Sequence, residues 1–146
     1  MSLETALRSH LAGKTEITAV CSNRILFGEV DASREQLPQI VFTIDDHDFA
    51  STLDTPVDLH MPLCAFEIRA DDPEHIDTLS DLVRRSLLEL EDGATIGSES
   101  VECLTMIDGG SDETPITIRD DDDTVRVLRR LVMAEIGYRY TLTAVT

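Results

Sequence analysis

Most of the residues that could carry chemistry in this chain are carboxylates. The longest acidic run has four consecutive members: Asp120, Asp121, Asp122 and Asp123. Such a run could attract a divalent cation, but it lacks the alternating ligands and the distal glutamate of an EF-hand loop. Asp45, Asp46 and Asp48 follow an apolar segment, as turn residues at the end of a strand do. We interpret both groups as solvated acidic segments and predict no metal site.

Cysteines and histidines are too scattered to suggest a shared site. The sequence has no Cys-x-x-Cys, His-x-x-x-His or His-x-Glu pair, the spacings that bring two ligands together. We expect the cysteines to be small buried residues, and we predict neither a disulfide framework nor a bound metal or cofactor. The residues concerned are Cys21, Cys64, Cys103, His10, His47, His60 and His75.

Signatures of catalysis are also missing from the sequence. It shows no recognisable nucleophile beside a base, no paired catalytic carboxylates and no glycine-rich loop after a strand. Gly109 and Gly110 form an isolated pair, which is typical of a turn rather than of a phosphate-binding loop. The sequence therefore favours a protein without enzymatic activity.

The chain carries a strong excess of negative charge. Its 29 aspartate and glutamate residues against 12 lysine and arginine residues give a formal net charge of −17 at pH 7. Such a surface repels phosphates, so stable DNA binding by phosphate neutralisation is not expected. Lys14 is the only lysine, and aspartate excess with arginine replacing lysine resembles proteins from cells that hold molar salt, which screens the repulsion. We predict a halophilic source, with an ordinary acidic protein as the alternative.

One local basic cluster follows the aspartate run directly and consists of Arg126, Arg129 and Arg130. Guanidinium groups bind carboxylates through paired hydrogen bonds. We therefore expect these arginines to form ion pairs, within the chain or between subunits, in preference to binding an anion. Together with the four aspartates they make a candidate channel or intersubunit charge loop, within an acidic loop at about 109–124.

Length and hydropathy fit one compact domain covering residues 1–146. A chain of 146 residues can bury a core without disulfide or metal staples. No apolar stretch approaches the roughly 18 residues of a membrane-spanning helix. No basic region precedes an apolar segment at the start of the chain, so no secretory signal is expected. We predict no association with a membrane.

Apolar periodicity predicts the elements of the first half of the chain. Leu3, Ala6, Leu7 and Leu11 recur at helical spacing. Three later segments are rich in β-branched residues or alternate between apolar and polar residues. The expected elements are a helix over 3–11, one further helical turn near 17–20, and strands over 25–27, 39–44 and 61–69, the last two paired antiparallel.

A long central helix and two further strands are predicted in the second half. Asp72 and Pro73 are typical of an N-cap and a first helical position, and apolar residues then recur every three or four positions as far as Leu90. Strands are expected over 101–107 and, with strict alternation, over 132–142. Residues 124–131 either extend the last strand or form a helical turn capped by Asp123.

This order of elements predicts an α+β fold with a mostly antiparallel four- to five-stranded sheet and two helices packed on one face. Consecutive strands are expected to form hairpins on either side of the long helix. The connection at about 47–60 is too long for a tight hairpin and is rich in apolar side chains, so we expect a protruding loop that contacts another subunit or another protein. Its candidate interface residues are Phe49, Leu53, Val57 and Leu59.

Several segments share their order and apolar pattern with a known family. They are Met1 to Leu11, Ser22-Asn23-Arg24-Ile25, Leu37-Pro38-Gln39-Ile40-Val41-Phe42, Phe66-Glu67-Ile68-Arg69-Ala70 with the helix from Asp72 to Glu91, and Ile136-Gly137-Tyr138-Arg139-Tyr140. In these segments the chain resembles the tail-terminator family of long-tailed viruses, also called tail-completion or tail-to-head joining proteins. The resemblance spans nearly the whole chain and rests on order, length and loose apolar patterns.

The resemblance implies an α+β subunit that forms a sixfold ring on the last ring of tail tube protein, stops its polymerisation and offers a surface to the head connector. Such a homohexamer is assembled in the host cytoplasm and stays in the virion, where viral DNA passes through it without specific binding. No catalysis is implied. A heterologous ring also suits the residues alone, because rotational closure protects exposed strand edges. The acidic insertion at 112–123 and the extreme charge depart from the family, and they leave the interfaces open.

Two other classes of protein fit the same sequence. One is another neck ring, such as a head-tail stopper or adaptor, which a stoichiometry of twelve or contact with the portal would distinguish. The other is a small acidic ligand- or cation-binding domain, which would be monomeric with a ligand in a defined pocket.

Overall fold

The computed structural model describes residues 3–33, 36–45, 59–90, 95–96, 99–120 and 123–139. These residues form three helices and seven strands. The helices are α1 (Leu3–Ala12), α2 (Thr15–Cys21) and α3 (Pro73–Leu88). The strands are β1 (Ile25–Phe27), β2 (Gln39–Asp45), β3 (Leu59–His60), β4 (Leu63–Ala70), β5 (Thr95–Ile96), β6 (Glu99–Asp120) and β7 (Asp123–Arg139).

All seven strands belong to one sheet, in the order β1-β2-β4-β7-β6-β5, with β3 also paired to β7. The α+β class and the antiparallel pairing of β2 with β4 are confirmed. Two details of the prediction are wrong. The structure has three helices instead of two, because the expected turn near 17–20 is a helix of its own. β1 runs parallel to β2, since the connection over residues 28–38 brings the chain back to the same end of the sheet instead of reversing it in a hairpin.

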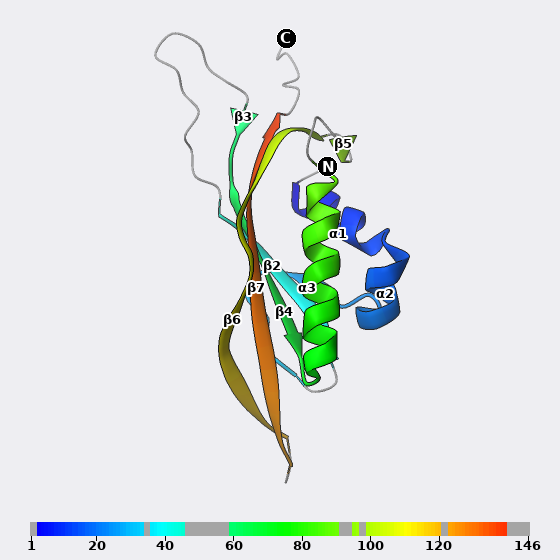
Figure 1. The fold of residues 1–146 in the computed structure, drawn as a ribbon, viewed down its shortest axis with the longest axis vertical. Coiled ribbons are helices and arrows are strands. Elements are labelled where there is room, and N and C mark those ends of the chain that lie inside the picture. The colour runs from blue at the N-terminus through cyan, green and yellow to red at the C-terminus, as the bar shows by residue number, and fades with distance from the viewer. Residues whose placement is uncertain are drawn as a thin grey trace, which may run out of the picture.

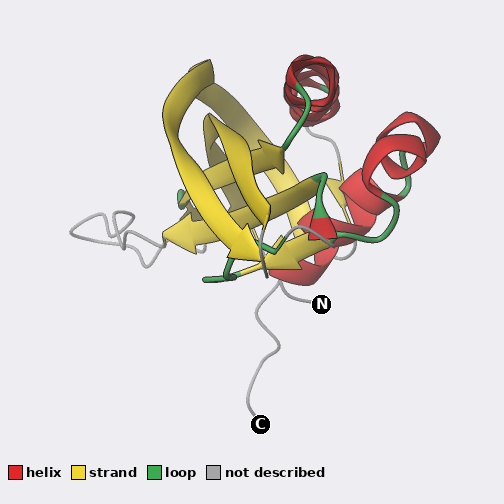
Figure 2. Cartoon of the chain, turned by 90° about the horizontal axis from the view of Figure 1, so that it is seen from below, coloured by secondary structure: helices red, strands yellow, loops and turns green. Residues whose placement is uncertain are grey.

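The three helices cover one face of the sheet (Figures 1 and 2). Along β4, alternate side chains point to these helices and are fully buried, as are their neighbours on β2 and β7. The rings of Phe42 and Phe66 stack there at 5.4 Å between centroids. No helix in the described part of the chain is long and apolar enough to cross a membrane.

α3 begins as its sequence predicts. The Asp72 side chain accepts a hydrogen bond of 2.9 Å from the backbone N–H of Glu74, and Pro73 follows as the first helical residue. The buried side of the helix then follows its apolar stripe, which includes Ile76, Leu79 and Val83. This packing fixes α3 against the sheet and places its polar residues toward the β6–β7 hairpin and solvent.

The acidic loop predicted at about 109–124 is wrong in the described residues. Residues 109–120 belong to β6, and β7 begins at Asp123. Ile116, Thr117 and Ile118 pair in register with Val127, Arg126 and Val125. Asp112 fits into such a strand because its side chain remains solvated. Residues 124–131 extend the last strand, so the helical turn considered for them does not form.

Gly109 and Gly110 also lie within β6 and do not form the predicted turn. Between the pairs Asp108↔Met133 and Ser111↔Leu131, β6 has two residues where β7 has one, which makes a β-bulge. Gly110 adopts a φ of +140°, a conformation that favours glycine. A Cβ atom at this position would lie 3.3 Å from Cδ of Arg130, so the glycine also lets that side chain cross the strand.

The end of the β6–β7 hairpin extends beyond the rest of the sheet. The last residue of β4 that pairs with β7 is Ala70, opposite Leu128. Among the described residues, 116–120 and 123–127 pair only with each other, and we call this part the arm. Figure 1 shows it reaching past the start of α3.

Candidate functional site

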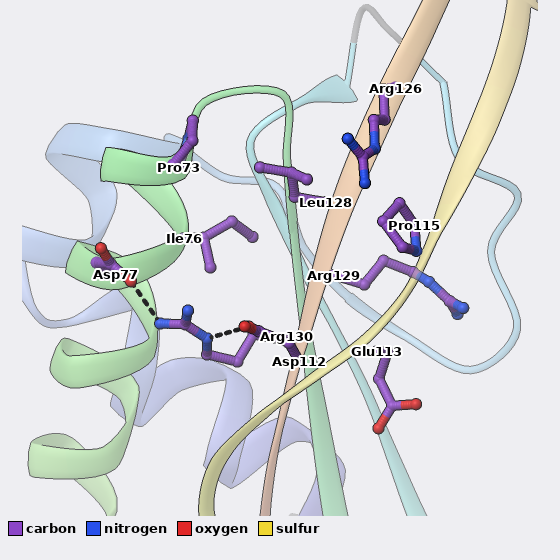
Figure 3. A pocket seen from close by; sticks show the side chains of 10 residues that line it. All are labelled: Pro73, Ile76, Asp77, Asp112, Glu113, Pro115, Arg126, Leu128, Arg129 and Arg130. Carbon is purple, nitrogen blue, oxygen red and sulfur yellow. Dashed lines mark hydrogen bonds and ion pairs between the residues drawn. The ribbon is translucent and has the colours of Figure 1, made fainter.

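Arg130 joins the hairpin to the helix layer. It projects from β7 toward α3, and its Nη1 lies 2.6 Å from Oδ1 of Asp77. Its Nε lies 2.7 Å from Oδ1 of Asp112 on β6 (Figure 3). The hydrogen bond that Arg130 donates to Asp112, followed by the one it donates to Asp77, raises the pKa of its guanidinium above the usual value. Arg130 is thus a permanently charged link between three elements.

Arg129 faces the opposite side of the sheet and enters a second network. Its Nη1 donates to Oε1 of Glu67 at 2.9 Å, and two further guanidinium nitrogens donate to the carbonyl of Thr114. Oε2 of Glu67 accepts from Arg69, which also binds the Gln39 side chain. Only 9% of the Arg69 side chain and 18% of the Glu67 side chain are exposed. This buried chain of charges ties β2, β4, β7 and β6 together.

Arg126 behaves differently from its two neighbours. It is exposed on the arm, and none of the ion pairs among the described residues includes it. Arg119 on β6 is likewise exposed and has no such pair. The prediction of intrachain ion pairing therefore holds for Arg129 and Arg130, with Glu67, Asp77 and Asp112 as partners. The side chains of the aspartate run at 120–123 lie outside the described residues.

A cavity of about 380 Å³ opens between the start of α3 and the root of the arm (Figure 3). Its lining combines apolar residues with three arginines and three carboxylates. None of these lining residues is a cysteine, histidine or serine. The lining residues are Pro73, Ile76, Asp77, Asp112, Glu113, Pro115, Arg126, Leu128, Arg129 and Arg130.

A second cavity, of about 450 Å³, lies between the α1–α2 connection and α3. The Lys14 ammonium group donates a hydrogen bond to the Glu89 carboxylate across this cavity. That bond lowers the pKa of Glu89 below its usual value, with a further Coulombic contribution from Lys14. This site is a polar contact between the helices.

Cys21 and Cys64 are buried, as predicted. Burial raises the pKa of the Cys21 thiol, which makes it a poor nucleophile. Within the described residues, no three histidine, cysteine, aspartate or glutamate side chains gather in a way that could hold a metal ion.

The candidate interface in the predicted loop at about 47–60 falls largely outside the described residues. Phe49, Leu53 and Val57 lie there entirely. Leu59 is the first residue of β3, where its backbone pairs with Arg139.

Sequence analysis missed Glu67, Arg69 and Arg119 as members of charged clusters. The alternation of Glu67 and Arg69 with buried Phe66 and Ile68 on one predicted strand was the available signal, because it places both charges on the face away from the core.

Comparisons with known proteins identify a shared fold. No family model matches the chain, and no curated protein matches it in sequence. A solved structure described as the virion of a native gene transfer agent (GTA) particle contains a similar chain. The two chains are 13% identical, the alignment covers 93% of this chain and 95% of that one, and the TM-score is 0.56. The likeness extends over almost the whole of both chains and shows that they share a fold.

Proposed function

We propose that this chain is a structural virion protein that forms a ring, most simply a homohexamer, at the end of a tail tube and joins it to the head connector. The observation that carries the proposal is the shared fold with a chain of a virion particle over 93% of this sequence. The order of segments in the sequence, which resembles the tail-terminator family, supports the terminator role among virion proteins. We propose an assembly function without catalysis.

The shape of the subunit supports ring formation. β6 is an edge strand whose only described outer neighbour is the two-residue β5. A long strand edge and a projecting arm offer surfaces to a neighbour, and a heterologous contact between unlike surfaces generates a ring when the rotation closes. The bulges in β6 hinder open-ended pairing of this edge. A closed ring with a fixed number of subunits is the assembly that this edge favours.

The charge of the chain suits a ring through which DNA passes. A net charge of −17 disfavours contacts with phosphates, and we propose that Asp120, Asp121, Asp122 and Asp123 contribute to a negative channel. Replacing all four by asparagine tests this. Normal tails with slower genome ejection would support the channel position. Failure of rings to assemble would assign the aspartates to the interface between subunits.

The same charge supports a halophilic source. If the protein is adapted to molar salt, its thermal midpoint should rise steeply between 0.1 M and 2 M salt, because screening removes self-repulsion. An unchanged midpoint would indicate an ordinary acidic protein.

The oligomeric mass of the purified chain, measured by analytical ultracentrifugation in low and molar salt, tests the proposed function. We expect rings of six. Rings of twelve that bind the portal would indicate an adaptor. A chain that stays monomeric under all conditions and never enters particles would refute the proposal.

Deleting residues 49–56 tests the predicted loop as a contact to the neighbouring subunit or to the tube. We expect a folded protein that loses ring formation or tube docking, because surface loops can be shortened at little cost to folding. Normal rings and normal tails would remove these residues from the interface. Loss of folding would assign the segment to the core.

A further inference from the structure

The arm has two unlike faces and lies beyond the last residue pair between β4 and β7. On one face Ile116, Ile118 and Val125 are half-buried, and Val127 at the root is buried. On the other face four exposed residues lie together: Thr117 and Arg119 on β6 and Thr124 and Arg126 on β7. An isolated two-stranded hairpin is marginally stable at best in water. The arm is therefore a segment that gains from a partner.

Arg119 and Arg126 differ from the other described cations of the chain. Every other lysine or arginine whose side chain is described donates to a carboxylate or a backbone carbonyl of the same chain: Arg8, Lys14, Arg24, Arg69, Arg84, Arg85, Arg129 and Arg130. In a chain with 29 acidic residues, two exposed arginines without such a bond stand out, and both lie on one face of the arm.

A surface of opposite character lies at the other end of the sheet, on the face away from the helices. Two rows of paired residues cross the strands β2, β4, β7 and β6 there. They are Thr43–Ala65–Met133–Asp108 and Asp45–Leu63–Glu135–Thr105. We call these eight residues the open face. They include three carboxylates and no cation, and Leu63, Ala65 and Met133 are only half-buried. The open face is both acidic and partly apolar.

The arm cannot reach the open face of its own chain. Arg126 and Glu135 are nine residues apart on one extended strand, which separates them by about 30 Å. The network of Glu67, Arg69 and Arg129 lies on the part of the sheet between them. Contact between these two surfaces therefore requires two copies.

We propose that the arm of one copy lies on the open face of the next copy, with Arg119 and Arg126 facing the carboxylates of Asp108 and Glu135. The proposal rests on the proposed function in requiring self-assembly, and it specifies the contact. The arm and the open face are different surfaces, so each copy both donates an arm and accepts one. Such a heterologous contact leads to a ring when the rotation between copies closes. Opposite charges provide the orientation, and the half-buried apolar side chains of the open face provide area to bury.

The test reverses charges on each of the two surfaces. Assembly is measured as the mass of the particles that form, at the salt concentration at which the wild-type chain forms rings. The variant Arg119→Glu/Arg126→Glu should raise the concentration needed for half-assembly at least about tenfold, because like charges then meet. Glu135→Arg should have a similar effect. The matched control is Arg84→Glu/Arg85→Glu on α3, which changes the charge equally but should leave assembly unchanged. Circular dichroism checks that each variant folds.

Mixing the two defective variants gives the decisive result. In an alternating ring, the unaltered arm of the Glu135→Arg copy meets an unaltered open face, and the acidic arm meets the arginine face. We expect the mixture to recover rings that neither variant forms alone.

Three outcomes would contradict the proposal. If Arg119→Glu/Arg126→Glu forms rings as readily as the wild type, the arm is not the contact between copies, although the chain does form rings. Normal rings combined with failed tail completion would make the tube, not a second copy, the partner of the arm. Two defective variants that do not complement each other would exclude the open face as the acceptor. A wild-type chain that never assembles would instead refute the proposed function.

Discussion

The two halves of the β6–β7 hairpin have similar sequences of alternating residues but different surroundings. In the body of the sheet, β7 lies between β4 and β6, and its Val132 and Ala134 are fully buried beneath the helices. In the arm, the apolar Val125 and Val127 lie on the opposite face of β7 from Val132 and Ala134, and no third strand among the described residues pairs with this part of β7. Alternation thus specifies strand geometry in both halves, whereas the packing of a face depends on which other elements reach it.

The two halves also treat their arginines differently. Arg129 and Arg130, at the root, are held by three carboxylates from β4, α3 and β6. Arg126, only three residues earlier in the arm, has no ion pair with a described residue. The position where β4 ends and α3 begins therefore separates arginines that are paired within the fold from arginines that are available for association. The following predictions test this difference.

Truncating a core side chain should have the largest effect. Phe66→Ala removes a fully buried ring that stacks on Phe42, so we expect a loss of about 3–5 kcal/mol in the free energy of unfolding. The matched truncation in the arm, Ile118→Ala, should cost less than about 1 kcal/mol in the unassembled protein, because that side chain is only half-buried. Denaturant unfolding followed by circular dichroism gives both values. Equal losses would mean that the arm is packed as tightly as the body.

Removing the charge at the centre of the buried network should have the next largest effect. Glu67→Gln preserves the shape of the side chain but weakens its hydrogen bonds to Arg69 and Arg129, so we expect a loss of about 2–3 kcal/mol. The same substitution at Glu113, which faces Arg129 from β6 without a described ion pair, should change the stability by less than about 0.5 kcal/mol. Similar losses in the two variants would argue against a special role for the Glu67 network.

A smaller effect is expected where the hairpin is attached to α3. Asp77→Asn/Asp112→Asn removes the charge of both carboxylates that pair with Arg130, but these side chains are 70% and 74% exposed, so the loss in stability should stay below about 1 kcal/mol. Amide hydrogen exchange in β6 near Asp112 should nevertheless become faster, because the root of the arm loses its link to the helix. Asp81→Asn serves as the control, since Asp81 pairs only with Arg84 and Arg85 within α3. Equal exchange rates in the two variants would contradict the proposed link.

The smallest effect should be the pH dependence of the Lys14–Glu89 pair in the helix layer. The hydrogen bond from Lys14 lowers the pKa of Glu89 from its usual value of 4.5. A lowered carboxyl pKa stabilises the folded state above the unfolded pKa, and this contribution is lost as the pH falls through the folded pKa. The thermal midpoint of the wild type should therefore exceed that of Glu89→Gln at pH 6 to 7 and converge with it in acid. A difference that grows toward low pH would contradict this sign.

Much of the fold could be predicted because its signals are local. The N-cap at Asp72, the proline at the first helical position and the apolar stripe of α3 all act within a few residues of each other. The antiparallel pairing of β2 and β4 followed from two neighbouring strand patterns. The candidate site was only partly predictable, because its arginines were recognised as a cluster but most of their partners were not.

The sequence by itself determined the α+β class, the position of α3 and the large excess of negative charge. Tertiary structure alone decided that the segment after Asp108 is strand rather than loop, since its hydrogen bonds come from β7. It also decided that Arg129 pairs with Glu67, 62 residues away, and Arg130 with Asp77, 53 residues away. The physical reason is that helix caps and strand alternation depend on adjacent residues, whereas ion pairs and sheet order depend on which distant segments the core brings together.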